Sequence, residues 1–359
     1  MKRILFVIPF LSSGGAERVV SIWSSELAKL GSDVHLLVFY RVDNEYPVER
    51  KVNFHTISEG KSEYVAMSQV QKLFNLRRKF KEINPDFVLP FISHVGIMAT
   101  IASLSLPLKI IETIRIDPRY SPQKKVLRIL RNVSVFFSKR CIVQNEKQKK
   151  YFPLWLQKHI VVFPNPIANE FIQNKKVFTN KEIRNIVAVG RLEKQKNYPM
   201  LIRAFSKIAQ ENNQIILRIY GEGSLYNDLY DYINKLKLND RIILCGRTRN
   251  INQILQESDM YILSSDAEGM PNSLMEAMAI GLPCISTDCP TGPADLIENG
   301  MNGYLIPIQD EDALIQSMKK MIGNIDNAIE MGKRARVTIA TRYTSNVSAS
   351  NLLKFLESL

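Results

Sequence analysis

Two glutamates separated by seven residues, Glu268 and Glu276, lie where the residue types and spacing of this sequence best fit a chemical role. An apolar run of strand type, Asp259–Ser265, precedes them, and a helical pattern over Asn272–Ile280 contains Glu276. The free N–H groups at the start of such a helix attract an anion, above all a phosphate. A carboxylate beside a phosphate is favourable where it accepts hydrogen bonds from ligand hydroxyls, which sugars and riboses supply. The stretch predicts a nucleotide-sugar pocket, with a solvated helix start as the alternative.

Two cations, Arg191 and Lys196, share one short loop after the strand predicted over Ile186–Gly190. A diphosphate leaving group gains negative charge as a glycosidic bond breaks. A fixed guanidinium and a fixed ammonium group there stabilise the transition state more than the ground state. The alternative is a pair of solvated loop cations.

A glycine pair, Gly14 and Gly15, follows the first predicted strand, Arg3–Ile8, and opens the first predicted helix. Glycine lets the backbone turn tightly and come close to a ligand, with a helix N-terminus behind it. The G-x-G-x-x-G dinucleotide fingerprint is absent. The pair therefore predicts either a loop that lines a ligand or only a turn.

Strand and helix patterns alternate along the chain and restart once, which predicts two α/β domains with mainly parallel sheets. A length of 359 residues also favours two domains over one core. We predict an N-terminal domain over residues 1–170, a C-terminal domain over residues 171–345 and a linker over residues 160–181. The apolar run at Met1–Pro9 is too short for a signal peptide and is predicted to be the first strand. The four cysteines show no metal-binding or disulfide spacing and are predicted to be reduced.

The net charge of +13 belongs to the first half of the chain. Residues 1–170 hold 26 Lys and Arg against 14 Asp and Glu, whereas residues 171–359 hold 22 against 21. No zinc knuckle or RNA-binding aromatic strand accompanies this charge, so we expect no nucleic-acid partner. We expect an anionic membrane surface instead.

Two basic segments in that half, Gln69–Ile83 and Gln123–Arg140, have amphipathic helical patterns. Each could lie on lipid headgroups, or could be a core helix with a solvated basic face. In the second segment the basic side chains are Lys124, Lys125, Arg128 and Arg131. No run of about 20 apolar residues occurs, so no membrane-spanning segment is predicted.

These motifs together resemble the retaining glycosyltransferases of family 4. The resemblance rests on the E-x7-E spacing of Glu268 and Glu276, on Gly-Arg-Leu-x-x-x-Lys-Asn at 190–197 and on Gly-Gly-Ala-Glu at 14–17. It implies the GT-B fold, in which two Rossmann-like domains face a central cleft and the last helix, here residues 346–359, packs back on the N-terminal domain. It covers nearly the whole chain and is strongest from Val187 to Pro307.

The resemblance also implies roles for individual residues. Glu268 would hold the donor sugar, Glu276 the ribose, and Arg191 and Lys196 the donor diphosphate. Further donor contacts are implied for Gly14, Gly15, Gly190, Gly221, Arg247, Met270, Pro271, Asn272 and Ser273.

Candidates for the acceptor side are Glu17, His94 and Arg115. The segment Ile114–Pro118 resembles the Glu-Arg-Asn-Asp-Pro variant of some polysaccharide enzymes, which makes Arg115 the counterpart of a cleft histidine found in many family members. His94 follows the fourth predicted strand, and a packing or surface role is its alternative. No cluster of metal ligands is legible, so we expect no metal and no cofactor.

The resemblance implies transfer of a hexose or N-acetylhexosamine from a UDP-sugar to a lipid-linked glycan during assembly of a bacterial surface polysaccharide such as lipopolysaccharide or capsule. We expect a cytoplasmic protein held peripherally on the inner face of the cell membrane. Two alternatives remain open: a sugar-nucleotide isomerase or epimerase on the same fold, and a basic interaction protein with an inactive site.

Overall fold

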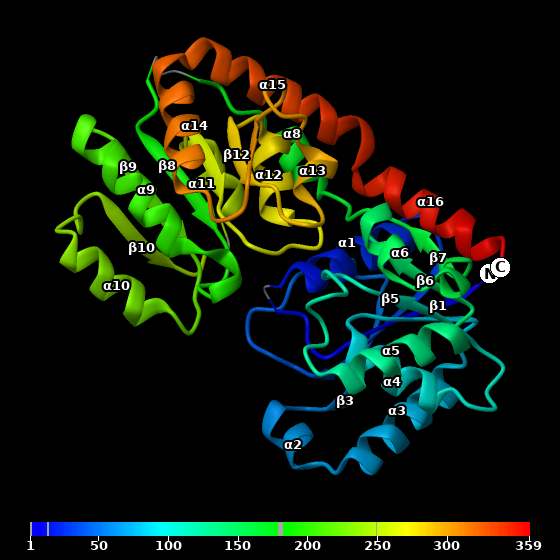
Figure 1. Cartoon of the computed structure of the whole chain (residues 1–359). Coiled ribbons are helices and arrows are strands. Elements are labelled where there is room, and N and C mark those ends of the chain that lie inside the picture. Colours follow the sequence, from blue (N-terminus) through cyan, green and yellow to red (C-terminus); the bar gives the residue numbers. More distant parts are fainter. Residues whose placement is uncertain (1, 13, 179–181, 249) are drawn as a thin grey trace. The chain divides into compact units, whose positions relative to one another are not determined.

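The computed structural model describes residues 2–12, 14–178, 182–248 and 250–359, which form two compact units (Figure 1). Unit 1 comprises Met1–Pro166 and Ser345–Leu359, and unit 2 comprises Ile167–Thr344. Unit 1 carries 27 Lys and Arg against 14 Asp and Glu, whereas unit 2 carries 21 of each, so the whole net charge of +13 lies in unit 1.

Unit 1 contains a parallel sheet with the strand order β3-β2-β1-β4-β5-β6-β7. Its strands are β1 (Arg3–Ile8), β2 (Asp33–Tyr40), β3 (Asn53–Ser58), β4 (Phe87–Pro90), β5 (Lys109–Thr113), β6 (Arg140–Val143) and β7 (Ile160–Val162). Its helices are α1 (Gly15–Lys29), α2 (Lys61–Ala66), α3 (Gln69–Ile83), α4 (Ser93–Ala102), α5 (Lys125–Phe137), α6 (Glu146–Tyr151), α7 (Leu154–Gln157) and α16 (Ser345–Glu357).

Both faces of this sheet are covered, which is why the central strands β1 and β4 are continuous apolar runs. Ile4, Phe6 and Ile8 of β1 pack in one core cluster with side chains of α1 and α16. The alternate residues of β1, Leu5 and Val7, pack in another cluster with side chains of α3 and α4. Figure 1 shows α3, α4 and α5 side by side on one face. The indole Nε1 of buried Trp23 on α1 donates to Ser348 Oγ on α16 at 2.9 Å.

Unit 2 contains a second parallel sheet, with the strand order β10-β9-β8-β11-β12-β13. Its strands are β8 (Asn185–Val189), β9 (Ile216–Tyr220), β10 (Ile242–Gly246), β11 (Met260–Leu263), β12 (Cys284–Thr287) and β13 (Tyr304–Ile306). Its helices are α8 (Asn169–Gln173), η1 (Lys194–Lys196, a 3₁₀ turn), α9 (Tyr198–Glu211), α10 (Tyr226–Lys235), α11 (Ile251–Glu257), α12 (Asn272–Ile280), α13 (Pro293–Leu296), α14 (Glu311–Gly323) and α15 (Ile325–Arg342).

Helices α9, α10 and α14 share one core cluster of unit 2, and α8, α11 and α12 share another. Helix α12 is buried from Leu274 to Ile280, and Gly281 ends it in the left-handed conformation at φ 98°. The sequence pattern of this helix is apolar all round because both the sheet and neighbouring helices cover it.

The parallel sheets agree with the predicted alternation, but the predicted linker is wrong in part. Strand β7 pairs with β6 in the sheet of unit 1, and Phe171 of α8 is buried in the core of unit 2. Both lie within residues 160–181, whose Pro- and Asn-rich composition suggested a loop. Residues 179–181 of that segment lie outside the described residues.

Candidate active site

The strand order of unit 2 reverses between β8 and β11, and ligands of open α/β sheets bind at such a point, beyond the carboxyl ends of the strands. The loop after β8 contains Arg191 and Lys196, and the loop after β11 contains Glu268. The fold therefore brings together at one edge two motifs that lie 72 residues apart in the sequence.

Lys196 and Glu268 form an ion pair, with Lys196 Nζ 2.6 Å from Glu268 Oε1. Their side chains are only 15% and 11% exposed. Ser265 Oγ donates to the same carboxylate oxygen at 2.7 Å, and the Thr291 hydroxyl donates to the backbone carbonyl of Glu268. The carboxylate is thus fixed by a cation and a hydroxyl, and its backbone by a second hydroxyl.

Hydrogen bonds join the two loops along their length. The Asp266 N–H donates to Gln195 O at 2.8 Å, Ser264 Oγ donates to Lys196 O at 2.8 Å, and Asn197 Nδ2 donates to Asp266 Oδ1 at 3.0 Å. Asn197 adopts the left-handed conformation, with φ 46°, which asparagine tolerates better than most residues. The two loops therefore hold their charged side chains as one structure.

Two glycines leave room where these loops touch their neighbours, and at Gly221 the neighbour is backbone. A Cβ atom at Gly190 would lie 2.8 Å from Lys196 Cε, and one at Gly221 would lie 1.9 Å from Gly190 O. The buried Tyr198 hydroxyl donates to Gly190 O at 3.0 Å, and burial raises the pKa of Tyr198, which keeps it a donor. Gly190 thus leaves room for the Lys196 side chain, and Gly221 leaves room for the Gly190 carbonyl.

The other predicted donor residues of unit 2 differ in their accessibility. Arg191 and Arg247 follow β8 and β10 and are exposed. Glu276 lies on α12 and is buried, as are Met270 and Pro271 in the preceding loop. Asn272 and Ser273 form the first turn of α12 and are half-buried; buried Tyr261 donates to Ser273 Oγ at 2.8 Å.

In unit 1, Gly14 and Gly15 stand at the N-terminus of α1, beyond the carboxyl end of β1. The carboxylate of Glu17 folds back over Gly14, where a Cβ atom would lie 2.1 Å from Glu17 Oε2. Ser13 of the predicted loop lies outside the described residues. The Glu17 carboxylate therefore occupies the space that a side chain at position 14 would fill.

The remaining acceptor candidates follow β4 and β5 of unit 1. His94 is exposed in the first turn of α4. The Arg115 guanidinium lies 4.4 Å from the Trp23 ring and 5.1 Å from the Phe91 ring, and Nη1 donates to Asn165 Oδ1 at 3.3 Å. Desolvation lowers the pKa of Arg115 to about 9. Aromatic stacking therefore fixes the orientation of Arg115.

Sequence reasoning missed the residues that position the pair. Ser265, Gln195, Asn197 and Tyr198 each form a hydrogen bond to a residue of the two loops. Asn197 belongs to the motif at 190–197 but was given no role, and no periodicity or charge signal marks the other three. The only available signal was their proximity in sequence to Lys196 and Glu268. Gln195 and Asn197 act through the contact between the loops after β8 and β11, which is a property of the fold, whereas Ser265 and Tyr198 bond close to themselves in sequence.

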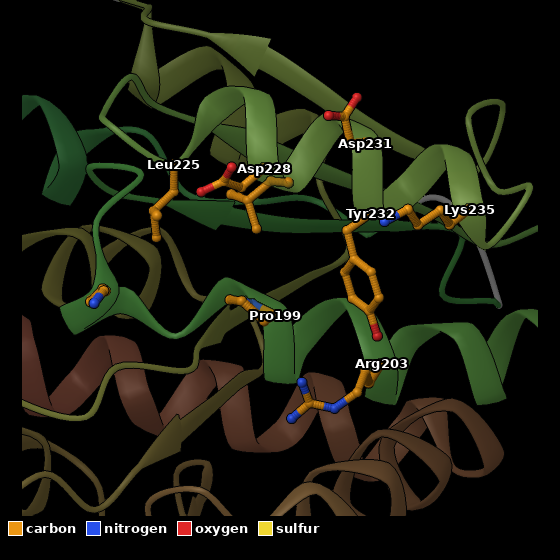
Figure 2. Close-up of a pocket in the computed structure, with 9 residues that line it drawn as sticks. Pro199, Arg203, Leu225, Asp228, Asp231, Tyr232 and Lys235 are labelled. Carbon is orange, nitrogen blue, oxygen red and sulfur yellow. The ribbon is translucent and has the colours of Figure 1, made fainter.

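A separate open groove lies between α9 and α10 (Figure 2). It is lined by Lys194, Pro199, Arg203, Leu225, Asp228, Leu229, Asp231, Tyr232 and Lys235. None of these residues belongs to the predicted site, and the groove has both cationic and anionic side chains. We assign it no ligand.

Within the described residues, no cluster of three or more His, Cys, Asp or Glu side chains is placed to hold a metal ion. In the same part of the chain, none of the helices combines the length and apolar character needed to cross a bilayer.

Two family models match the chain in the order of its two units. The model described as "Glycosyl transferase 4-like" matches residues 8–141, and the model described as "Glycosyl transferases group 1" matches residues 169–338. The chain belongs to the family-4 type of bacterial glycosyltransferases. This membership supports glycosyl transfer over the isomerase and over the inactive interaction protein that the sequence left open.

Similar glycosyltransferases cover almost the full chain. An N-acetylgalactosamine-N,N'-diacetylbacillosaminyl-diphospho-undecaprenol 4-alpha-N-acetylgalactosaminyltransferase of Campylobacter jejuni is 27% identical, over 99% of this chain and 100% of that enzyme. The amylovoran biosynthesis glycosyltransferase AmsD of Erwinia amylovora is 28% identical, over 90% of this chain and 91% of its own length.

The structure of HepE from Anabaena in complex with UDP and glucose superposes with a TM-score of 0.82 at 17% identity, over 100% of each chain. This likeness confirms that the chain has the predicted GT-B fold.

Proposed function

We propose that this glycosyltransferase moves a hexose or N-acetylhexosamine from a UDP-sugar to a lipid-linked glycan, with retention of anomeric configuration, in bacterial surface-polysaccharide biosynthesis. The observation that carries the proposal is the Lys196–Glu268 ion pair, held at the strand-order reversal of unit 2. The named acceptor class of the Campylobacter relative and the UDP complex of HepE support the choice of substrates.

The Lys196–Glu268 pair places a carboxylate and an ammonium group next to each other, and each would act on a different part of the donor. A carboxylate accepts hydrogen bonds from sugar hydroxyls, whereas an ammonium group offsets the charge that grows on a departing diphosphate. Because Lys196 is already fixed by Glu268, little reorganisation is needed as that charge develops. Exposed Arg191 on the same loop would add a second cation, and Glu276 would hold the ribose.

Retention fits a front-face reaction better than a double displacement. Retaining glycosidases place two carboxylates about 5 Å apart on either side of the scissile bond. Here Glu268 and Glu276 flank one helix start and both are assigned to the donor. In the proposed reaction the acceptor oxygen bonds to the anomeric carbon on the face that UDP leaves. The departing phosphate takes the acceptor proton.

The acceptor is proposed to bind unit 1 through Glu17, His94 and Arg115. Unit 1 is also the proposed contact with the inner face of the cell membrane, because its net charge is +13 and that of unit 2 is zero. The reaction is proposed to need no metal, since Arg191 and Lys196 supply the positive charge near the diphosphate.

A donor screen tests this proposal. UDP-glucose, UDP-galactose and their N-acetyl derivatives are incubated with the enzyme and an undecaprenyl-diphosphate-linked glycan, with and without excess EDTA. We expect transfer from one donor, with retained configuration in the product and an unchanged rate in EDTA. Inversion would contradict the front-face scheme, and activity restored only by Mg²⁺ or Mn²⁺ would contradict metal independence.

A further inference from the structure

Helix α5 in unit 1 is folded with its apolar side outward. The apolar side chains recur at helical spacings of three and four residues, and all are exposed: Val126, Ile129, Leu130, Val133, Phe136 and Phe137. The face turned toward the unit carries buried Arg131 and Ser134, together with Val135. A helix on a folded domain normally buries its apolar stripe.

Polar contacts hold the inner face of α5 in this orientation. Arg131 Nη1 donates to Pro118 O and to Ser121 O, each at 2.8 Å. The Ser134 hydroxyl donates to buried Glu112 of β5. The sequence interpretation of Arg131 as one of the basic surface residues is therefore wrong, because its charge is satisfied inside the unit.

The exposed stripe continues onto α7. Leu154 and Trp155 are 84% and 54% exposed, and the Phe136 and Trp155 rings lie 5.7 Å apart. The Phe136 and Phe137 rings lie 5.3 Å apart. We call this set of eight apolar side chains on α5 and α7 the α5–α7 surface. Contiguous exposed apolar surface of this kind marks an interaction site.

The charge around the α5–α7 surface identifies its partner. Residues 118–169 contain eleven Lys and Arg and a single acidic residue, Glu146. Lys124, Lys125, Lys139 and Lys158 flank α5 and α7 and are exposed. A second copy of the chain would bring the same basic border against itself, whereas an anionic bilayer offers both an apolar layer and opposite charge.

We propose that the α5–α7 surface inserts at shallow depth into an anionic lipid bilayer, with the flanking lysines at the headgroups. The proposal deepens the proposed function and rests on it, because a lipid-linked acceptor is confined to a bilayer. Helix α5 begins just after the loop that leaves the carboxyl end of β5, where Arg115 lies. Insertion would therefore place the acceptor side of unit 1 next to the lipid surface.

The chain contains a built-in probe for this insertion. It has two tryptophans, of which Trp23 is fully buried and Trp155 belongs to the α5–α7 surface. With vesicles of equal parts phosphatidylglycerol and phosphatidylcholine, we expect tryptophan emission to shift to shorter wavelength and to be quenched by lipids brominated near the headgroup. Trp155→Phe should abolish the shift, and phosphatidylcholine vesicles should produce a much weaker one.

A matched pair of double variants separates insertion from general stickiness. Ile129→Gln with Phe137→Gln removes side chains that are 63% and 68% exposed on α5. Val337→Gln with Val177→Gln removes side chains that are 62% and 73% exposed in unit 2. We expect the α5 double variant to lower vesicle affinity by roughly tenfold or more and the control to leave it unchanged. Lys124→Ser and Lys125→Ser should each lower it roughly fivefold at low salt.

Equal losses in the two double variants, or vesicle binding without a Trp155 shift, would overturn the proposal. A dimer that the α5 double variant dissociates, with vesicle binding unchanged, would assign the surface to a second copy instead. These readouts need no turnover. A chain that inserts as described but transfers no sugar would therefore refute the proposed function and support the docking surface.

Discussion

Helices α5 and α9 carry apolar stripes of the same helical period and place them in opposite environments. In α9, Met200, Leu201, Phe205 and Ile208 are buried in the core of unit 2. In α5 the corresponding stripe is exposed, and Arg131 and Ser134 face inward. An apolar stripe shows that one face of a helix packs against something. The residues on the opposite face decide whether the stripe packs on the core of its own domain or binds an outside partner.

The two units also differ in the loops at the carboxyl ends of their strands and in their net charge. In unit 2, two loops are joined by hydrogen bonds around the Lys196–Glu268 pair, and the net charge is zero. In unit 1, Glu17 and Arg115 each contact their own neighbours, and the net charge is +13. A preorganised, neutral unit suits a small charged donor, whereas a basic unit with an exposed apolar surface suits an acceptor at a bilayer.

The largest effect is expected at Glu268. Glu268→Gln should lower kcat by about a thousandfold, because the proposed partner of the carboxylate is the transferred sugar. UDP affinity should stay nearly unchanged, whereas Glu276→Gln should weaken it through the ribose. Initial rates and calorimetric titration of UDP measure the two effects. Equal losses of UDP affinity in both variants would end the proposed division of roles.

The polar anchor of α5 gives a pH-dependent effect. Burial raises the pKa of Glu112 from 4.5 to about 7, although hydrogen bonds from Ser134 and Thr100 lower it. The folded protein therefore binds a proton that the unfolded chain releases, and stability is lost as pH rises from about 4.5 through 7. The loss corresponds to about 3 kcal/mol. Glu112→Gln should remove it, so urea unfolding at pH 5 and pH 8 should show a flatter profile than the wild type. Parallel profiles would contradict this.

Substitutions of Lys196 and Arg191, the two cations proposed to bind the donor diphosphate, should differ in their effect on the free energy of unfolding. Lys196→Ala leaves the Glu268 carboxylate without its cation, and should lower the free energy of unfolding by about 2 kcal/mol. Arg191→Ala removes an exposed side chain and should leave stability within about 0.5 kcal/mol of the wild type. Both should reduce kcat more than donor affinity. Denaturant unfolding and steady-state kinetics are measured for both variants. A stability loss in Lys196→Ala no larger than that in Arg191→Ala would contradict the stabilising role of the ion pair.

The sequence predicted most strands of both sheets because these are apolar runs bounded by turn residues, and it predicted Lys196 and Glu268 because they belong to recognisable motifs. It missed β3, Asn53–Ser58, whose sequence is largely polar. It could not predict Asn197 as a positioning residue, since its partner Asp266 lies on another loop, and no pattern marked the Ser265 hydroxyl as the partner of Glu268. It predicted that Arg131 lies on the basic surface, whereas Arg131 is buried, because a helical pattern does not show which face of the helix is covered. Strand β7 was missed because three residues, Ile160–Val162, suffice at the edge of a sheet.

The central claim is that unit 2 binds the donor and unit 1 contacts the membrane. Hydrogen exchange measured by mass spectrometry tests it most directly, with a UDP-sugar in one sample and anionic vesicles in another. The UDP-sugar should slow exchange in residues 190–197 and 264–276 and leave residues 118–158 unchanged. Anionic vesicles should slow exchange in residues 118–158 and leave the two loops of unit 2 unchanged. Protection of the same residues by both ligands, or of residues 118–158 by the UDP-sugar alone, would contradict the account.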